Sequence, residues 1–128
     1  MTVSSYTGVK DVESFTTGGA ITSDKQGLFL VASGTGTVAV NTTAKGYCVG
    51  VFAPQNDVAS GGQCAVIVGG RVDVQAGGTI VKGGLVASNN AGKAVAFADG
   101  YVLGRALSAG ASGGIVTVQL LTAYVPAP

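Results

Sequence analysis

Apolar and polar side chains alternate in several short segments of the chain. Residues 37–41 read Thr-Val-Ala-Val-Asn, residues 71–75 read Arg-Val-Asp-Val-Gln, and residues 116–120 read Val-Thr-Val-Gln-Leu. A period of two is typical of a β-strand with one buried face, and branched Val and Thr side chains suit a pleated surface. No segment shows the 3.6-residue period of a convincing amphipathic helix. The pattern therefore predicts an all-β protein.

Glycine pairs and clusters of Asn, Asp and Ser separate these segments, at roughly 8–12-residue intervals. They include Gly61-Gly62, Gly69-Gly70 and Gly113-Gly114, where glycine accepts the positive φ angles of tight turns. This spacing favours a small β-barrel or β-sandwich of about eight short strands, and residues 57–59 suit a short helical turn. We expect strands near Phe29–Ala32, Thr37–Val40, Tyr47–Phe52, Cys64–Val68, Arg71–Gln75, Leu85–Ala87, Ala94–Phe97, Tyr101–Leu107 and Ile115–Leu121.

The chain contains an internal repeat, in which residues 18–68 and 77–121 share landmarks in the same order. The offset falls steadily, from 59 between Gly18 and Gly77 to 52 between Gly61 and Gly113. Two copies are too few for a solenoid, so we interpret them as two halves of one closed domain. The matched landmarks are Gly18-Gly19 with Gly77-Gly78, Gly27-Leu28 with Gly84-Leu85, Val31-Ala32-Ser33 with Val86-Ala87-Ser88, Val38-Ala39 with Val95-Ala96, Gly46-Tyr47-x-x-Gly50 with Gly100-Tyr101-x-x-Gly104, and Ala59–Gly62 with Ala111–Gly114.

The repeat predicts a single β domain over residues 17–122, with an N-terminal extension over 1–16 and a proline-containing tail over 123–128. Proline cannot donate to a sheet ladder, so the tail is not expected to join a central strand. Each end is either frayed or an extended arm that reaches a neighbouring subunit. If they are arms, the candidate subunit or capsid contacts are their larger apolar side chains, Tyr6, Val9, Phe15, Tyr124 and Val125.

Charge is sparse: 10% of the residues are charged, the net charge is +1, and 47% are hydrophobic. A monomer with so few charges would have little to keep it soluble, which favours a homo-oligomer or a protein docked on a larger assembly. The basic residues are scattered, which argues against nucleic-acid binding. No apolar run approaches the ~20 residues that a membrane span needs, and the N-terminus lacks the apolar core of a signal peptide. We expect synthesis in a cytoplasm.

The chain lacks the groups of common catalytic sites. Without histidine it cannot form a Ser-His-Asp triad or a Cys-His pair. The six Asp and Glu residues fall mostly in predicted turns or on outward strand faces, and the glycine-rich segment 33–37 is not followed by a helix that could bind phosphate. The spacing of Cys48 and Cys64 does not suggest a metal site, and there is no histidine to complete one. Two cysteines are too few for a disulfide framework, and two buried free thiols are favoured over a bridge. We therefore expect no enzymatic activity, no cofactor and no metal.

The order of landmarks in the second copy resembles a family of small phage proteins that decorate, or cement, the capsid. The resemblance rests on Ala76–Ile80, Lys82–Val86, Ala91–Val95, Tyr101–Leu107 and Ile115–Leu120. It implies a structural virion protein that binds the major capsid protein on the outer surface of the head and stabilises it, as a homo-oligomer and most often a trimer.

Two other functions fit the composition. A head fibre or receptor- and glycan-binding β module would need an exposed aromatic cluster. The equivalent residues Tyr47 and Tyr101 suit the core or rim of their own halves, and an aromatic content of 6% without Trp disfavours a carbohydrate-binding module. A carrier domain would use Lys82 as its modified lysine, but the usual acidic or methionine neighbour before it is missing, which favours a simple turn lysine.

Overall fold

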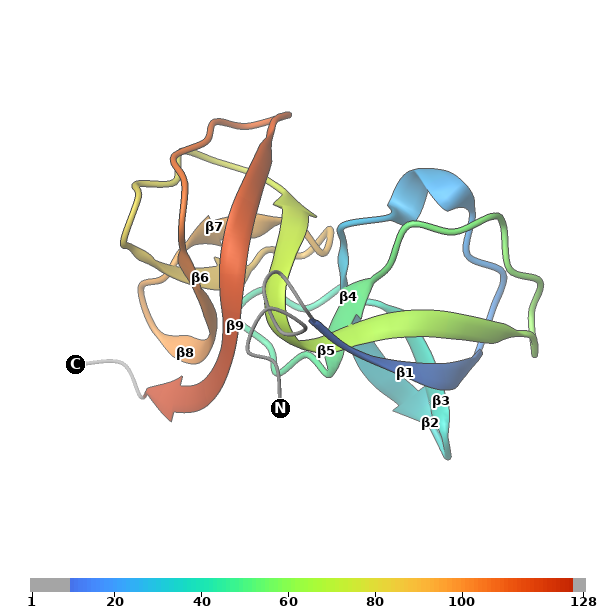
Figure 1. Ribbon diagram of the computed structural model, residues 1–128. Helices are drawn as coiled ribbons and strands as arrows, with labels where there is room; N and C mark the ends of the chain where they lie inside the picture. Colours follow the sequence, from blue (N-terminus) through green and yellow to red (C-terminus); the bar gives the residue numbers. More distant parts are fainter. Residues whose placement is uncertain (1–9, 126–128) are drawn as a thin grey trace, which may run out of the picture.

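The computed structural model describes residues 10–125 of the chain, with side chains from Asp11 to Leu121. Nine β-strands form one mixed sheet over this range, so the predicted all-β fold class is confirmed (Figure 1). The strands are β1 (Lys10–Thr17), β2 (Phe29–Gly34), β3 (Thr37–Val40), β4 (Gly50–Phe52), β5 (Gln63–Gln75), β6 (Leu85–Ser88), β7 (Ala94–Ala96), β8 (Gly100–Ala106) and β9 (Ile115–Val125).

The short helical turn expected at residues 57–59 is not present. A 3-10 helix, η2, lies instead at Ser23–Lys25. The Asp57 carboxylate accepts a hydrogen bond from the Ser23 backbone N–H at 2.7 Å, so Asp57 holds the start of the helical turn rather than forming one.

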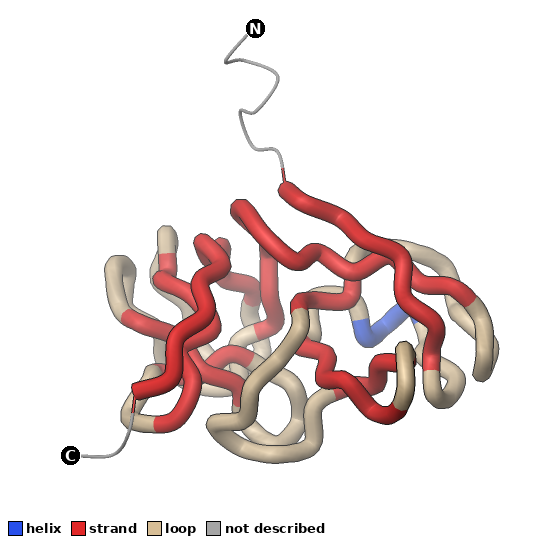
Figure 2. The backbone as a smooth tube through the Cα atoms, turned by 90° about the horizontal axis from the view of Figure 1, so that it is seen from below, coloured by secondary structure: helices blue, strands red, loops and turns tan. Residues whose placement is uncertain are grey.

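The strands close into two rings that share β5. In the first half, β1, β3, β2, β4 and β5 pair in this order, and β5 pairs back with β1. In the second half, β5, β9, β8, β6 and β7 pair in order, and a parallel bridge between Ala76 and Ala94 closes the ring. We call these the first barrel and the second barrel. They lie side by side, joined by β5 (Figures 1 and 2).

The shared strand β5 corrects one sequence prediction, since Gly69-Gly70 is not a turn and the two strands expected around it are one strand of 13 residues. Gly70 has a φ of 80°, a conformation that glycine adopts without steric cost. The chain therefore bends there without reversing, and the strand continues. The bend lets β5 pair with Lys10–Thr16 of β1 before it and with Ile115–Gln119 of β9 after it.

The predicted N-terminal extension over residues 1–16 is wrong for residues 10–16, which belong to β1. This strand pairs with β5 on one side and with β3 on the other. Phe15 packs against the core of the first barrel, and the buried Thr17 donates its hydroxyl to the Ala59 carbonyl at 2.7 Å. Pairing on both sides makes a strand of a segment whose own apolar content is low.

The predicted boundary of the C-terminal tail is also wrong, because β9 continues to Val125. Tyr124 lies opposite Tyr101 and Val125 opposite Gly100 in the ladder with β8. Proline restricts the residue before it to extended conformations, which are the conformations of a strand. Pro126 therefore does not prevent residues 123–125 from pairing.

The two barrels repeat the same backbone hydrogen bonds. Thr17 N–H donates to Gly62 O in the first, and Ala76 N–H donates to Gly114 O in the second, both at 2.9 Å. The Ile21–Val58 bridge likewise recurs as Ile80–Gly110. These pairs keep the offsets of 59 and 52 residues seen at the two ends of the repeat.

In the middle of the repeat, the structure corrects the alignment by one residue. Leu30 pairs with Gly50, and Val86 pairs with Gly104, so Leu30 corresponds to Val86 and not to Leu85. Gly27 likewise corresponds to Gly83, since both have a φ near 85° and both donate to the last residue of the strand opposite, β4 or β8. Short runs of Gly, Ala and Val match equally well in adjacent registers, and only the pairing separates them.

Two apolar cores fill the structure. The first barrel encloses Ile21, Leu30, Val38, Phe52, Cys64 and Val66. The second core lies inside the second barrel and extends to the outward side chains of the first barrel, including Phe29, Val51 and Ile67. The outer face of β2, β4 and β5 in the first barrel is therefore the surface on which the second barrel packs.

Gly50 and Gly104 occupy equivalent positions where two strands approach closely. A Cβ at Gly50 would lie 2.4 Å from the Ile67 carbonyl oxygen, and one at Gly104 would lie 2.6 Å from that of Gln119 and 2.2 Å from Val118 Cγ1. Neither has a positive φ, so the requirement for glycine here is one of space. The repeated Gly-Tyr-x-x-Gly motif thus marks the same packing constraint in both barrels.

Gly104→Ala should lower the free energy of unfolding by about 1–3 kcal/mol, the usual cost of overpacking a filled core. Gly19→Ala is the matched control, because no atom lies within 4 Å of its added methyl group, and it should be nearly neutral. Urea denaturation of the two variants checks this. Equal loss of stability in both would refute the packing explanation.

Candidate functional site: the crevice between the barrels

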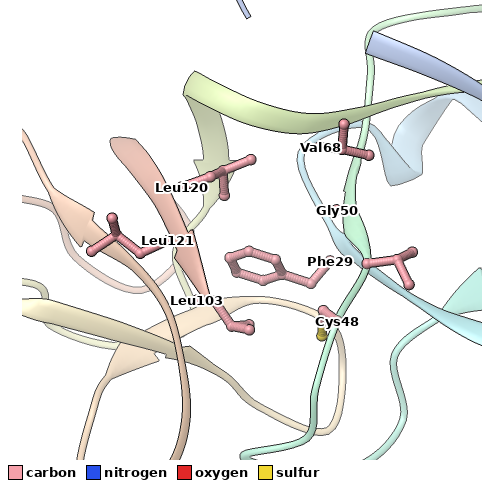
Figure 3. A pocket seen from close by; sticks show the side chains of 8 residues that line it. Phe29, Cys48, Gly50, Val68, Leu103, Leu120 and Leu121 are labelled. Carbon is pink, nitrogen blue, oxygen red and sulfur yellow. The ribbon is translucent and has the colours of Figure 1, made fainter. Parts of the chain in front are cut away.

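A narrow apolar crevice lies where the two barrels meet (Figure 3). The Phe29 ring sits between Leu103 and Leu120 of the second barrel and Val68 of the first. The remaining lining comes from Cys48, Val49, Gly50 and Leu121. The space suits about one water molecule and no larger ligand, so the crevice is a seam between two packed units and not a pocket for a substrate.

Two tyrosines stand beside this seam, one from each barrel. The rings of Tyr47 and Tyr101 meet edge to face, with centroids 5.3 Å apart and an interplanar angle of 65°. Such pairs stabilise by about 0.5–1.5 kcal/mol beyond the area they bury. The Tyr47 side chain remains 49% exposed. The sequence placed both tyrosines at equivalent rim positions, and the structure brings them into contact across the barrel interface.

A buried amide holds the barrels together below the surface. Asn41 follows β3 and is 1% exposed. Its Nδ2 donates to Ser88 Oγ at 2.8 Å and to the Asn89 carbonyl at 3.2 Å, both in the second barrel. Its Oδ1 accepts from the Thr43 N–H at 3.1 Å, which holds the loop after β3 in place. Each polar atom of this side chain thus has a partner, as burial requires.

The same loop makes an ion pair across the interface. Lys45 has a φ of 64°, and its Nζ lies 2.5 Å from the Asp99 carboxylate of the second barrel. Its backbone N–H donates to the Ser88 carbonyl at 2.8 Å, and its carbonyl accepts from the Tyr101 N–H at 3.3 Å. A side chain at Gly100 would collide with the Lys45 carbonyl at 2.7 Å. The loop between β3 and β4 is therefore held against the second barrel by an ion pair, by backbone hydrogen bonds and by close packing against Gly100.

Asn41→Ala should destabilise the protein by about 1–3 kcal/mol for each buried partner that it leaves unsatisfied. Asn90→Ala is the matched control, since Asn90 is exposed in the turn between β6 and β7. Chemical denaturation compares the two. If Asn41→Ala is as stable as Asn90→Ala, the buried amide does not hold the barrels together.

The two cysteines are buried and free, as the sequence favoured. Burial raises the pKa of the Cys48 thiol to about 12, and the nearby Ser88 hydroxyl opposes part of that shift. Burial also raises the pKa of Cys64. Neither thiol therefore has the lowered pKa of a reactive cysteine.

Because burial raises the pKa of Cys48 and keeps the thiol protonated at pH 8, the folded protein should resist Ellman's reagent. Unfolding in guanidinium should release both thiols to the reagent. Rapid labelling of Cys48 in the folded protein at pH 8 would contradict the burial that raises its pKa.

The described residues contain neither a candidate metal site nor a helix that could span a membrane. Within residues 10–125, no three His, Cys, Asp or Glu side chains gather to hold a metal ion. No helix in this range is long and apolar enough to span a bilayer. Lys82 lies exposed in a turn before β6.

Among the residues that the structure describes, the predicted contact residues lie in two different strands, β1 and β9. Phe15 is half-buried in β1 against the first core, while Tyr124 and Val125 continue β9 beside β8. Tyr6 and Val9 lie outside the described residues. Sequence reasoning missed the leucines of the crevice, Leu103, Leu120 and Leu121. The signal was present in Leu120-Leu121, where two adjacent leucines interrupt the alternation of β9 and supply one side chain to the core and one to the surface.

Comparison with known proteins gives a similarity of fold. No family model matches the chain, and no curated protein matches its sequence. Among solved structures, the chain is similar to the N-terminal base of head fiber gp8.5 of bacteriophage phi29, with a TM-score of 0.65 and 18% identity over 88% of this chain and 95% of that one. At this identity the similarity establishes a shared fold.

Proposed function

We propose that this protein is a structural component of a phage virion that attaches to the outer surface of the head, in the manner of a head fibre base. The observation that carries the proposal is the shared fold, which extends over 95% of the phi29 head fiber base. The phi29 protein is the base of a head fiber, and we transfer that role to this chain as a hypothesis.

The internal architecture supports a structural role. The crevice between the barrels is filled by side chains and leaves no room for a substrate. Both thiols are held in the protonated form by burial. A protein with stable packing and a weakly charged surface suits attachment in many copies, because small contacts repeated over a shell add up. The partner is then the major capsid protein, and the chain acts as a homo-oligomer, for which we favour a trimer.

A direct test uses the phage that encodes this chain. Virions purified on a gradient and separated into heads and tails should carry the protein with the heads. Heads assembled without it should bind the purified protein saturably. If the protein is absent from virions, or is found with tails alone, the proposed function is wrong.

The same heads separate a fibre base from a decoration protein that stabilises the shell. If the chain is a fibre base, heads with and without it should release DNA at the same temperature. A decoration protein would instead raise the release temperature. Binding of the isolated protein to host cells or glycans would favour a receptor-binding module that uses the Tyr47–Tyr101 pair, and loss of that binding in Tyr47→Ala would identify the pair as the site.

A further inference from the structure

The outer surface of the second barrel carries an ordered row of side chains across three strands. Arg71 of β5 lies opposite Gln119 of β9, and Gln119 lies opposite Arg105 of β8. Residues that pair in this way point to the same face of a sheet. Strand spacing places the two arginines about 10 Å apart, with the half-buried Gln119 between them. Both arginines are exposed.

Two exposed apolar side chains lie at the ends of the same face. Ile115 and Leu121 of β9 point outward with Gln119, because Val116 and Val118 between them point into the core. Their side chains are 58% and 43% exposed. We call this surface the β9 face and define it by Arg71, Arg105, Ile115, Gln119 and Leu121. A shallow hollow beside Ile115 and the crevice beside Leu121 bound it.

The arginines of the β9 face have no ionic partner among residues 11–121. The ion pairs in this range are Lys25–Asp24 and Lys45–Asp99. Arg105 donates to the Gly83 carbonyl at 2.7 Å, which orients its guanidinium without neutralising it. Asp73 is exposed on the same face, opposite Thr117 in the ladder, and its carboxylate accepts a hydrogen bond from the Thr117 hydroxyl at 2.8 Å instead of pairing with an arginine. Two exposed positive charges on a rigid sheet, one of them oriented by the Gly83 carbonyl, therefore remain available to carboxylates of another molecule.

The internal repeat shows that this kind of face accepts a partner. In the first barrel the corresponding row is Phe29, Val51 and Ile67, and the second barrel covers it. In the second barrel, Arg105 stands where Val51 stands in the first, and Gln119 stands where Ile67 does. Leu85, paired with Arg105, stands where Phe29 does, so one charge and one amide replace two of the three covered apolar side chains. Arg71 adds a second charge at the position of Val12, which is 52% exposed in the first barrel. Arginines flanked by exposed apolar groups suit a surface that binds a separate protein.

We propose that the β9 face is the surface by which this chain docks on the phage head, and that it binds a protein surface that presents carboxylates to Arg71 and Arg105 and apolar contacts to Ile115 and Leu121. This inference rests on the proposed function. Arginine pairs with carboxylates through two parallel hydrogen bonds, so the docked orientation is set by the spacing of the two guanidinium groups. Because the charges are exposed before binding, association is salt-dependent.

The test compares binding of three full-length proteins to heads assembled without this chain. The Arg71→Glu/Arg105→Glu variant should bind at least tenfold more weakly than the unchanged protein. Lys25→Glu/Lys93→Glu makes the same change in net charge at sites away from the β9 face, and should bind within about twofold of the unchanged protein. Cooperative thermal unfolding is used to check that both variants are folded. Raising the salt concentration should weaken the unchanged protein more than Arg71→Glu/Arg105→Glu.

The outcomes separate this inference from the proposed function. If the unchanged protein does not bind heads, the proposed function is wrong, and so is the inference that rests on it. If the unchanged protein binds and Arg71→Glu/Arg105→Glu binds equally well, the function stands and the inference is overturned. Sedimentation provides a third result: if this variant changes the oligomeric state, the face joins copies of the chain and the docking proposal is wrong.

Discussion

The continuity of β5 is the constraint on which the rest of the structure depends. A single strand serves as the last strand of one barrel and the first strand of the other, so the bend at Gly69-Gly70 is what lets one strand complete both barrels. This places the loop after β3 against the turns of the second barrel, where Asn41 and Lys45 make their contacts. It also directs the outer face of the first barrel toward Leu103 and Leu120. The barrels are thereby packed against each other, and side chains fill the interface between them.

The repeat is regular inside the barrels and divergent on their surfaces. Gly50 and Gly104 are required in both copies because the strand opposite leaves no space for a methyl group. The outward side chains of the strands are not under this constraint, and they differ between the two barrels. The first row is apolar and is covered at Phe29, Val51 and Ile67, while the second carries Arg71 and Arg105 and is exposed. A duplicated unit can in this way use one surface to hold itself together and the corresponding surface to bind something else.

Much of this fold follows from the sequence because its signals are local. Period-two alternation predicted β3 and most of β9, and glycine landmarks revealed the two halves. Local signals could not distinguish the bend at Gly69-Gly70 from a turn, since both need the same residues and differ only in the partners of the strand. They also missed β1, whose polar sequence becomes a strand through pairing on both sides. The β9 face could not be predicted, because Arg71, Gln119 and Arg105 are far apart in the chain and meet only through strand register.

An image of the head with the protein bound, by electron cryo-microscopy at a resolution that separates the two barrels, tests the central claim most directly. The account predicts density on the outer surface of the shell in which β8, β9 and the second half of β5 face the capsid, with the first barrel pointing away. Density in which the first barrel or the turns after η2 contact the shell, with Arg71 and Arg105 exposed to solvent, would contradict it.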